Sequence, residues 1–197
     1  GIACAHQGSL AFAVGEREWV SEAGFPGTVK RNRYVDLDGR CSGLISFNGQ
    51  LHAMTLNGVF IIDVGAESLQ KRARSMGKGC SAPASLRITG LGLLIWQGQQ
   101  TFYGMAPDGD AQDIMADDAT VFTRLVPAKL SRSVAVWNAA TREYICAVPE
   151  AGATASGAKG NILLLCYDGK GWRRQHHGIA YASLCITKDW RRYILGA

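Results

Sequence analysis

The side chains that most readily bind metals or transfer protons are scattered along this chain of 197 residues. The four histidines are His6, His52, His176 and His177. The last two are adjacent, and adjacent residues of a strand point to opposite faces of a sheet, so they would chelate one ion poorly. No third ligand follows at a suitable spacing. We therefore expect His176 and His177 to be surface residues, and we predict no metal site.

A group of acidic residues follows the central part of the chain. Its members are Asp108, Asp110, Asp113, Asp117 and Asp118. A calcium loop needs acidic oxygens at alternating positions, a glycine, and a closing glutamate about twelve residues from its start. The alternation ends at Gln112. Since Asp and Gly are turn residues in their own right, the group is interpreted as a turn.

The motifs that serve phosphate binding or covalent catalysis are incomplete in this chain. The glycine pairs of 77–79 and 90–92 lack the helix and the Lys-Ser/Thr of a phosphate loop. There is no Gly-x-Ser-x-Gly elbow. A propeller glycosidase would need paired carboxylates on facing strands. We predict no catalytic residue, no cofactor and no cofactor-binding residue, and hence no enzymatic activity.

One turn resembles a known carbohydrate-enzyme motif. The residues 167–172, Tyr-Asp-Gly-Lys-Gly-Trp, are similar to the Asp box of sialidases. The spacing is one residue shorter, and Cys166 stands at the Ser/Thr position of that motif.

The cysteine pattern indicates packing rather than metal binding. The six cysteines are Cys4, Cys41, Cys80, Cys146, Cys166 and Cys185. No two have the spacing of a metal clip. The last three lie in apolar runs, where cysteine behaves as a small hydrophobe. We expect reduced, buried thiols and an intracellular folding environment, although the even count leaves disulfides open.

The composition suggests a surface that other molecules cover. Charged residues make up 19% of the chain, below the usual quarter, and the net charge is +5. The basic pairs are scattered rather than gathered on one face, so we expect them to be solvated or to face other subunits rather than nucleic acid. No apolar run reaches the ~18 residues of a membrane span. Residues 1–14 lack the charged start of a signal peptide, and the missing initiator Met indicates a processed chain or part of a longer one.

The elements that must position these residues are short strands joined by tight turns. Asn48-Gly49 is the strongest two-residue hairpin signal, and with Asn57-Gly58 it predicts a three-stranded meander over residues 44–63. The stretch 80–118 contains another hairpin, with strands at 91–96 and 101–105. Aromatic residues of second strands are expected opposite aliphatic ones, such as Trp19 opposite Val14. Hairpins are predicted to begin near Leu10, Leu44, Leu91, Val134, Ile162 and Leu184.

The spacing of the first four hairpins, about 35 to 45 residues, is typical of propeller blades. The predicted fold class is all-β, with antiparallel hairpin and meander repeats in a β-propeller-like arrangement; a β-sandwich or barrel is the alternative. Residues 1–197 are expected to form a single β-rich domain or a fragment of a longer chain. Three segments are less regular. They are 66–76, a short helix or a loop; 120–130, a strand or a loop; and 150–160, an exposed flexible linker.

Several short phrases occur in a familiar order. They are Ser-Ala-Pro-Ala-Ser-Leu at 81–86, Gly-Leu-Gly-Leu-Leu-Ile-Trp at 90–96, Val-Ala-Val-Trp at 134–137, Arg-Glu-Tyr at 142–144, Asn-Ile-Leu-Leu-Leu-Cys-Tyr-Asp at 161–168 and Gly-Trp at 171–172. This order resembles the propeller domain of tailed-bacteriophage structural proteins, notably those of the tail nozzle or hub. The resemblance covers residues 44–172, about two thirds of the chain.

The resemblance implies a virion structural protein without enzymatic activity. Such a protein would fold in the host cytoplasm, take part in virus assembly and DNA ejection, and form a homo-oligomeric ring on the DNA exit path of the tail. Its partners would be other virion proteins (portal, adaptor or tail components), with transient passage of DNA and no membrane span. The alternatives are a carbohydrate-binding or polysaccharide-degrading propeller module for receptor binding, and a cellular propeller scaffold for protein partners.

Overall fold

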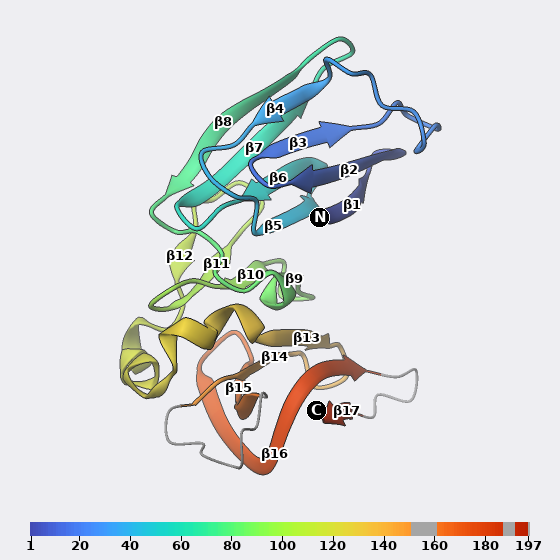
Figure 1. The fold of residues 1–197 in the computed structure, drawn as a ribbon. Coiled ribbons are helices and arrows are strands. Elements are labelled where there is room, and N and C mark those ends of the chain that lie inside the picture. Colours follow the sequence, from blue (N-terminus) through green and yellow to red (C-terminus); the bar gives the residue numbers. More distant parts are fainter. Residues whose placement is uncertain (151–160, 187–191, 197) are drawn as a thin grey trace. The chain divides into compact units, whose positions relative to one another are not determined.

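The computed structural model describes residues 1–150, 161–186 and 192–196, except for the side chains of 119, 161, 162, 176–183 and 192–196. The chain divides into two compact units, Gly1–Ser81 (unit 1) and Ala82–Ala197 (unit 2). Among the described residues, each unit consists of two antiparallel sheets whose strands follow one another in sequence order (Figure 1). The expectation of a single domain over 1–197 stays a prediction.

The first sheet of unit 1 is a four-stranded meander. Its strands are β1 (Ile2–His6), β2 (Ser9–Val14), β3 (Arg17–Val20) and β4 (Tyr34–Asp36). Gln7 and Gly8 join β1 to β2 with φ angles of 45° and 78°. Positive φ at both central residues is what a type I′ hairpin turn requires, because its twist matches that of the flanking strands. The sequence analysis missed β1, since Gln-Gly is a weaker turn signal than Asn-Gly.

The second sheet of unit 1 contains the predicted meander. Its strands are β5 (Gly43–Phe47), β6 (Gln50–Met54), β7 (Gly58–Val64) and β8 (Leu69–Met76). Asn48 and Gly49 have φ angles of 48° and 72°, so this hairpin forms as predicted. The three-stranded meander over residues 44–63 is confirmed, and β8 adds a fourth strand to it.

The prediction of a helix or loop at 66–76 was wrong, because β8 occupies most of that segment. β8 is at the edge of its sheet, and only Leu69 and Ser75 of its eight residues are buried. Its cations contact polar side chains of this unit. The contacts are Lys71 Nζ to Asp38 Oδ1 at 2.5 Å, Arg72 Nε to Asp63 Oδ2 at 3.1 Å and Arg74 Nη1 to Gln50 Oε1 at 3.3 Å. An edge strand that is polar on both faces lacks the apolar alternation by which strands are predicted.

Small and aliphatic residues form the core of unit 1. The buried cluster comprises Ala11, Ala13, Val20, Leu37, Cys41, Leu44, Leu51, Ala53, Phe60, Ile62 and Leu69. The residues of the first sheet that enter it alternate with outward-facing ones, as the two-residue period of a strand dictates. After β8 the chain passes close to the β6–β7 turn at Gly79, where a Cβ would lie 2.2 Å from the carbonyl oxygen of Leu56. This position therefore requires glycine.

Unit 2 begins with a third meander. Its elements are η1 (Pro83–Ser85), β9 (Arg87–Ile88), β10 (Leu94–Gln97), β11 (Phe102–Met105) and β12 (Gln112–Asp113). Two 3₁₀ segments follow, η2 (Ala116–Arg124) and η3 (Pro127–Arg132). The prediction of a strand or loop at 120–130 was therefore wrong. Pro127 begins η3 at a position where its missing N–H is not needed.

The last sheet has five strands. They are β13 (Val134–Asn138), β14 (Glu143–Val148), β15 (Asn161–Tyr167), β16 (Trp172–Ile186) and β17 (Arg192–Gly196). The two hairpins predicted after residue 161 share the long strand β16, which pairs with β15 near its start and with β17 near its end. Leu184 packs on Ile145 and Ala147, on the face of the sheet opposite the main core. Residues 187–191, with the predicted Lys188-Asp189 turn and Trp190, lie outside the described residues.

The segment predicted as a linker does not begin at Glu150. Glu150 is buried, forms a β-bridge with Leu125 and pairs with Arg124 at 2.6 Å. A flexible chain would leave this carboxylate in water, whereas here the ion pair orders it. The rest of the predicted linker, 151–160, lies outside the described residues.

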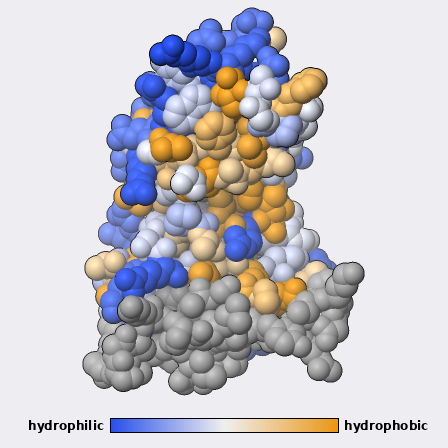
Figure 2. All heavy atoms as spheres, turned by 45° about the vertical axis from the view of Figure 1, so that its right-hand side comes forward, coloured by the Kyte–Doolittle hydropathy of each residue, from blue (hydrophilic) through white to orange (hydrophobic). Residues whose placement is uncertain are grey.

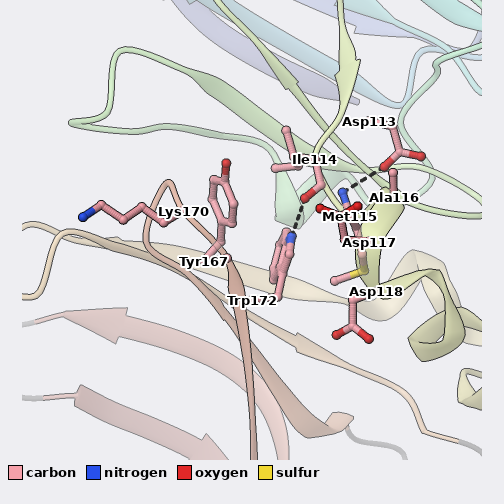
Figure 3. Close-up of a pocket in the computed structure, with 10 residues that line it drawn as sticks. Asp113, Ile114, Met115, Ala116, Asp117, Asp118, Tyr167, Lys170 and Trp172 are labelled. Atoms are coloured by element: carbon pink, nitrogen blue, oxygen red, sulfur yellow. Dashed lines mark hydrogen bonds between the residues drawn. The ribbon is translucent and has the colours of Figure 1, made fainter.

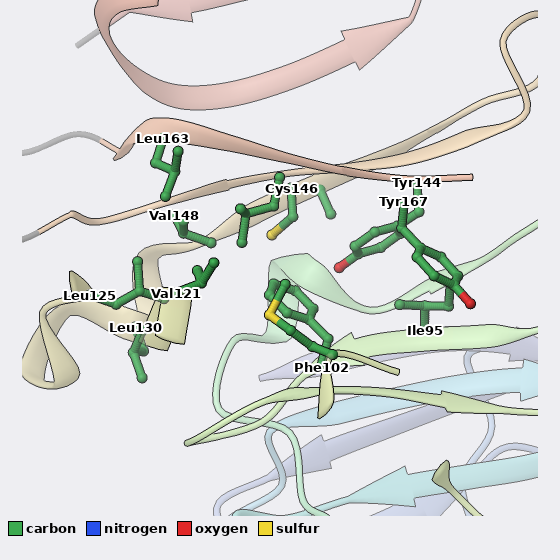
Figure 4. Packing of buried hydrophobic residues seen from close by; sticks show 13 residues of the cluster. Ile95, Phe102, Val121, Leu125, Leu130, Tyr144, Cys146, Val148, Leu163 and Tyr167 are labelled. Atoms are coloured by element: carbon green, nitrogen blue, oxygen red, sulfur yellow. The ribbon is translucent and has the colours of Figure 1, made fainter. Parts of the chain in front are cut away.

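An aromatic cluster joins the two sheets of unit 2 (Figure 4). Phe102 of β11 is at the centre, with its ring centroid 4.8 Å from that of Trp172 and 6.1 Å from that of Tyr144. The Tyr144 hydroxyl donates a hydrogen bond to the carbonyl oxygen of Ser85 at 2.8 Å. Aromatic pairs in such tilted and edge arrangements are favourable beyond the area they bury.

Aromatic residues pair with each other across strands, and the predicted pairing with aliphatic residues was wrong. Trp19 is opposite Phe12, Tyr103 is opposite Trp96, Tyr144 is opposite Trp137 and Trp172 is opposite Tyr167. The reason is the register of the strands. The two-residue turn after β2, for example, brings Val14 opposite Arg17 instead of Trp19.

The sheets recur at a nearly constant interval. They begin at Ile2, Gly43, Arg87 and Val134, which gives a repeat of about 41 to 47 residues. The predicted fold class, all-β with antiparallel meander repeats, is confirmed. Four successive meanders fit a β-propeller-like arrangement or a sandwich.

Candidate functional site

A hollow of about 310 Å³ in unit 2 gathers the acidic and aromatic residues that sequence analysis singled out separately (Figure 3). It lies where β12 and η2 approach the turn between β15 and β16. It is lined by Asp113, Ile114, Met115, Ala116, Asp117, Asp118, Tyr167, Lys170, Gly171 and Trp172. All of these residues belong to unit 2.

Two aromatic rings form the apolar wall of this hollow. Trp172 is partly exposed, and its indole Nε1 donates to the carbonyl oxygen of Ile114 at 2.7 Å. The Tyr167 ring lies 5.0 Å from that of Trp172, centroid to centroid. Burial, and then the charge of Asp168, raise the pKa of the Tyr167 phenol. Both rings are fixed in place, so the wall is preformed.

The turn that resembles an Asp box is held by its aspartate. Asp168 Oδ1 accepts hydrogen bonds from the backbone N–H of Lys170 at 2.9 Å and of Gly171 at 3.1 Å. These two hydrogen bonds, to Lys170 first, lower the pKa of the Asp168 carboxyl. Gly169 has a φ of 93°, which favours glycine. The Asp168 carboxylate thus stabilises the turn to which it belongs. Asp168 is not among the residues that line the hollow.

The acidic group separates into two parts. Asp108 and Asp110 are exposed, in the turn between β11 and β12, as the turn interpretation predicts. Asp113 Oδ1 accepts from Thr101 Oγ1 at 2.5 Å and from the backbone N–H of Met115 at 2.8 Å. Asp118 forms an ion pair with Arg174. Within the described part of the chain, no three His, Cys, Asp or Glu side chains are grouped so that they could hold a metal ion.

The histidines do not form a site together. His6 is 4% exposed, its Nδ1 lies 2.8 Å from Ser46 Oγ, and burial lowers its pKa. His52 is fully buried, and burial is the main cause that lowers its pKa to about 4. The side chains of His176 and His177 lie outside the described residues.

The structure reveals a buried carboxyl that sequence analysis missed. Glu18 of β3 has no solvent exposure, and neither of its carboxylate oxygens has a hydrogen-bond partner among the described residues. Burial raises the pKa of Glu18 to about 8. Burial and then Glu18 raise the pKa of Cys4 to about 11. The only signal in the sequence was a glutamate at a core-facing position of a strand, between the outward Arg17 and Trp19.

No disulfide joins any of the six cysteines, all of which are described. Cys41, Cys80, Cys146 and Cys166 are buried as predicted, but Cys185 is exposed. The prediction for Cys185 was wrong because an apolar run in a strand near a sheet edge still turns alternate residues outward. In each glycine pair, one glycine is closely packed and the other has a positive φ: Gly79 and Gly90 lie against neighbouring atoms, whereas Gly77 and Gly92 have φ angles of 75° and 76°. A Cβ on Gly90, for example, would lie 3.0 Å from the Trp137 ring.

An aromatic face covers the side of the first sheet opposite its core. Phe12, Trp19 and Tyr34 lie on adjacent strands, with ring centroids 5.4 Å and 6.5 Å apart. The Arg17 guanidinium is 4.1 Å from the Tyr34 ring centroid and bonds Asp36 at 2.6 Å. Val14, on the same side of β2 as Phe12, is 59% exposed. Figure 2 shows hydrophobic residues reaching the surface among hydrophilic ones.

None of the helices among the described residues combines the length and the hydropathy that crossing a bilayer requires. No protein-family model matches the chain, and no curated protein shows a significant sequence match to it.

Proposed function

We propose that this chain is a structural component of a bacteriophage tail, of nozzle or hub type, that forms a homo-oligomeric ring on the DNA exit path. The observation that carries the proposal is the succession of four antiparallel meanders at intervals of about 41 to 47 residues. Such repeats build rigid frames whose shape does not depend on a ligand. The order of motifs over residues 44–172, which resembles that of tail propeller domains, supports the same assignment.

The aromatic face of unit 1 supports a role in assembly. Phe12, Trp19 and Tyr34 present aromatic surface beside a charged Arg17–Asp36 pair. Aromatic residues and arginine are enriched at protein interfaces, and contiguous exposed apolar surface marks contact sites. In the proposed ring this face would contact a neighbouring subunit or another virion protein.

Electron microscopy and light scattering of the purified protein test the proposal. We expect closed rings and a mass several times that of the chain. Trp19→Ser should reduce the ring fraction, whereas Asp108→Ser, in an exposed turn of unit 2, should leave it unchanged. A strictly monomeric protein that binds no portal, adaptor or tail protein would contradict the proposal.

A second candidate function is carbohydrate binding, which the hollow in unit 2 favours. Sugar rings stack on aromatic faces and bond carboxylates through their hydroxyl groups, and this hollow offers Tyr167 and Trp172 beside Asp113, Asp117 and Asp118. Asp117 is exposed at the rim. A glycan array tests this function: binding that Asp117→Asn weakens and Asp108→Asn does not would support it, and silence on the array would remove it.

A further inference from the structure

Arg33 is a buried cation that has no carboxylate partner in the described part of the chain. It precedes β4 in unit 1 and is only 7% exposed. Its Nη1 donates to the carbonyl oxygen of Ser21 at 3.2 Å, and its Nη2 donates to that of Gly65 at 3.0 Å. Its Nε has no hydrogen-bond partner, and no ion pair of the described residues includes Arg33.

This arrangement leaves a charge to be neutralised. A guanidinium stays protonated in proteins, so Arg33 cannot lose its charge as a buried lysine or histidine can. Burying an unpaired ion costs several kcal/mol, and two carbonyl oxygens offset only part of that cost. The Ser21 and Gly65 carbonyls orient the guanidinium without balancing its charge.

A hollow of about 190 Å³ adjoins the Arg33 side chain. It is lined by His6, Gln7, Ser9, Ala23, Arg33, Val64, Gly65 and Ala66. No acidic residue is among these residues. Three acidic residues are next to lining residues in the sequence. Glu22 and Glu67 are 3.7 Å and 3.9 Å from Lys30 Nζ, and Asp63 Oδ2 is 3.1 Å from Arg72 Nε, so all three are paired with other cations.

The polar side chains that line the hollow belong to Arg33, Ser9, His6 and Gln7, and the first three can donate hydrogen bonds to a ligand, whereas Gln7 Nε2 donates to the carbonyl oxygen of Gly49 at 2.8 Å. The guanidinium of Arg33 has five N–H groups, of which two are used by the carbonyls of Ser21 and Gly65. Ser9 adds a hydroxyl. When the Ser46 hydroxyl donates to His6 Nδ1, the neutral ring has its proton on Nε2, which can then donate to a ligand. A cluster of donors around a fixed guanidinium is the chemistry that recognises carboxylate and phosphate oxygens.

We propose that this hollow in unit 1 binds a small oxyanion, a carboxylate or phosphate group, through Arg33. The anion neutralises the buried guanidinium and accepts hydrogen bonds from Ser9 and His6. The hollow, with a volume of about 190 Å³, has room for one such group and a few water molecules, since each molecule of liquid water occupies about 30 Å³. The site is independent of ring assembly, because all of its residues lie within one unit of one chain.

Titration calorimetry and thermal unfolding of the full chain test this site. Inorganic phosphate and acetate are compared with chloride at equal ionic strength. We expect a saturable rise of Tm and a measurable Kd with at least one of the two oxyanions. Saturation by phosphate alone identifies a phosphate-type ligand, and saturation by acetate alone identifies a carboxylate. A linear, unsaturable response that chloride reproduces would overturn the proposal.

Variants locate the binding. Arg33→Met should weaken oxyanion binding at least tenfold, whereas Arg31→Met, at an exposed position two residues earlier, should leave it unchanged. If Arg33→Met does not fold, Ser9→Ala should still weaken binding several-fold, and crystals of the unaltered chain grown with selenate should show the anion in the hollow. Selenate density elsewhere, or equal Kd values for the Arg31→Met and Arg33→Met variants, would contradict the assignment.

Discussion

The two units differ in whether their buried ionisable side chains are paired with groups of opposite charge. Among the described residues of unit 2, both buried acids have a cation: Glu143 pairs with Arg173 and Glu150 pairs with Arg124. In unit 1 the buried acid Glu18 has no partner among the described residues, and the buried cation Arg33 contacts only carbonyl oxygens. An unpaired buried ion is costly, and so is a carboxyl that burial keeps in its neutral form, so unit 1 gives up stability that unit 2 retains.

The aromatic side chains show the same difference. Those of unit 2 use their polar atoms to link separate elements, as with the Tyr144 hydroxyl on Ser85 and the Trp172 indole on Ile114. Two aromatic residues of the first sheet, Phe12 and Trp19, instead lie on the face opposite the core. We infer that two buried groups of unit 1, Glu18 and His52, make its stability depend on pH.

The largest effect is expected from Trp172→Ala. The change removes a ring packed on Phe102 and Tyr167 and leaves the Ile114 carbonyl without its donor. Loss of a fully buried large aromatic residue costs about 3–5 kcal/mol of unfolding free energy, and we expect the lower end of that range for the partly exposed Trp172. Denaturant unfolding measures it, with Trp19→Ala on the outer face of unit 1 as the matched control. Equal losses for the two variants would contradict the comparison.

Glu18 should make the stability of unit 1 fall as pH rises. Its folded pKa is about 8 against a model-peptide value of 4.5. Between these values the folded protein keeps a proton that the unfolded chain has lost, so stability falls by about 1.4 kcal/mol per pH unit. Glu18→Gln should therefore stabilise the protein by a few kcal/mol at pH 8.5 and have little effect at pH 4.5. Thermal unfolding at both pH values checks this, and an equal change at both would show that the carboxyl is not buried and neutral.

His52 should make the stability of unit 1 rise with pH, opposite to the effect of Glu18. Its pKa falls from 6.5 to about 4, so the unfolded chain binds the extra proton first as the solution is acidified. Stability from this group is present above pH 6.5 and is lost as pH falls towards 4. Together with Glu18, it predicts a stability maximum of unit 1 between about pH 4.5 and 6.5. Hydrogen exchange of the β3 and β6 amides measures the profile, and His52→Gln should remove only its acid limb.

Tyr144→Phe should lower the unfolding free energy by a smaller amount, and it tests a single hydrogen bond in unit 2. The ring and its packing stay, and only the 2.8 Å hydrogen bond to the Ser85 carbonyl is lost. A buried carbonyl left without its donor costs about 1–3 kcal/mol. Denaturant unfolding of this variant beside Tyr34→Phe, whose ring is 37% exposed, measures the difference. No difference between the two would indicate that water replaces the lost hydroxyl.

The smallest effect is expected from Arg72→Ala. Its pair with Asp63 is exposed on both sides, and such pairs contribute about 0–1 kcal/mol. Arg173→Ala in unit 2 is the matched change, because it removes a cation from the buried carboxylate of Glu143 and should cost more. Similar losses in denaturant unfolding would remove the contrast between surface and buried pairs.

The sequence predicted the fold wherever a turn residue determines the backbone. Asn48-Gly49 gave the register of its hairpin, because positive φ at both positions is rare outside such turns. The strand β8 could not be predicted from an alternation of apolar and polar residues, since at the edge of its sheet both of its faces are polar. The cross-strand partners of Trp19 and Tyr103 depended on turn lengths that composition does not reveal.

The candidate sites were less accessible to sequence reasoning. Asp113 and Trp172 are 59 positions apart in the chain, and only the packing of β12 against the β15–β16 turn brings them to one hollow. Glu and Arg are residue types that usually lie at the surface. The burial of Glu18 follows from the register of its strand and that of Arg33 from the path of its loop, and no local sequence pattern indicates either. A sequence motif cannot show that a charged residue such as Arg33 lacks a partner, because that depends on the three-dimensional structure.

The basic edge strand β8 has a consequence for how the protein behaves at high concentration. An unpaired strand edge is a template on which a second chain can add, and that is how fibres start. Lys71, Arg72 and Arg74 make such an addition repulsive, because two copies would bring like charges together. Neutralising all three should therefore leave the fold intact but make the concentrated protein prone to fibrous aggregation.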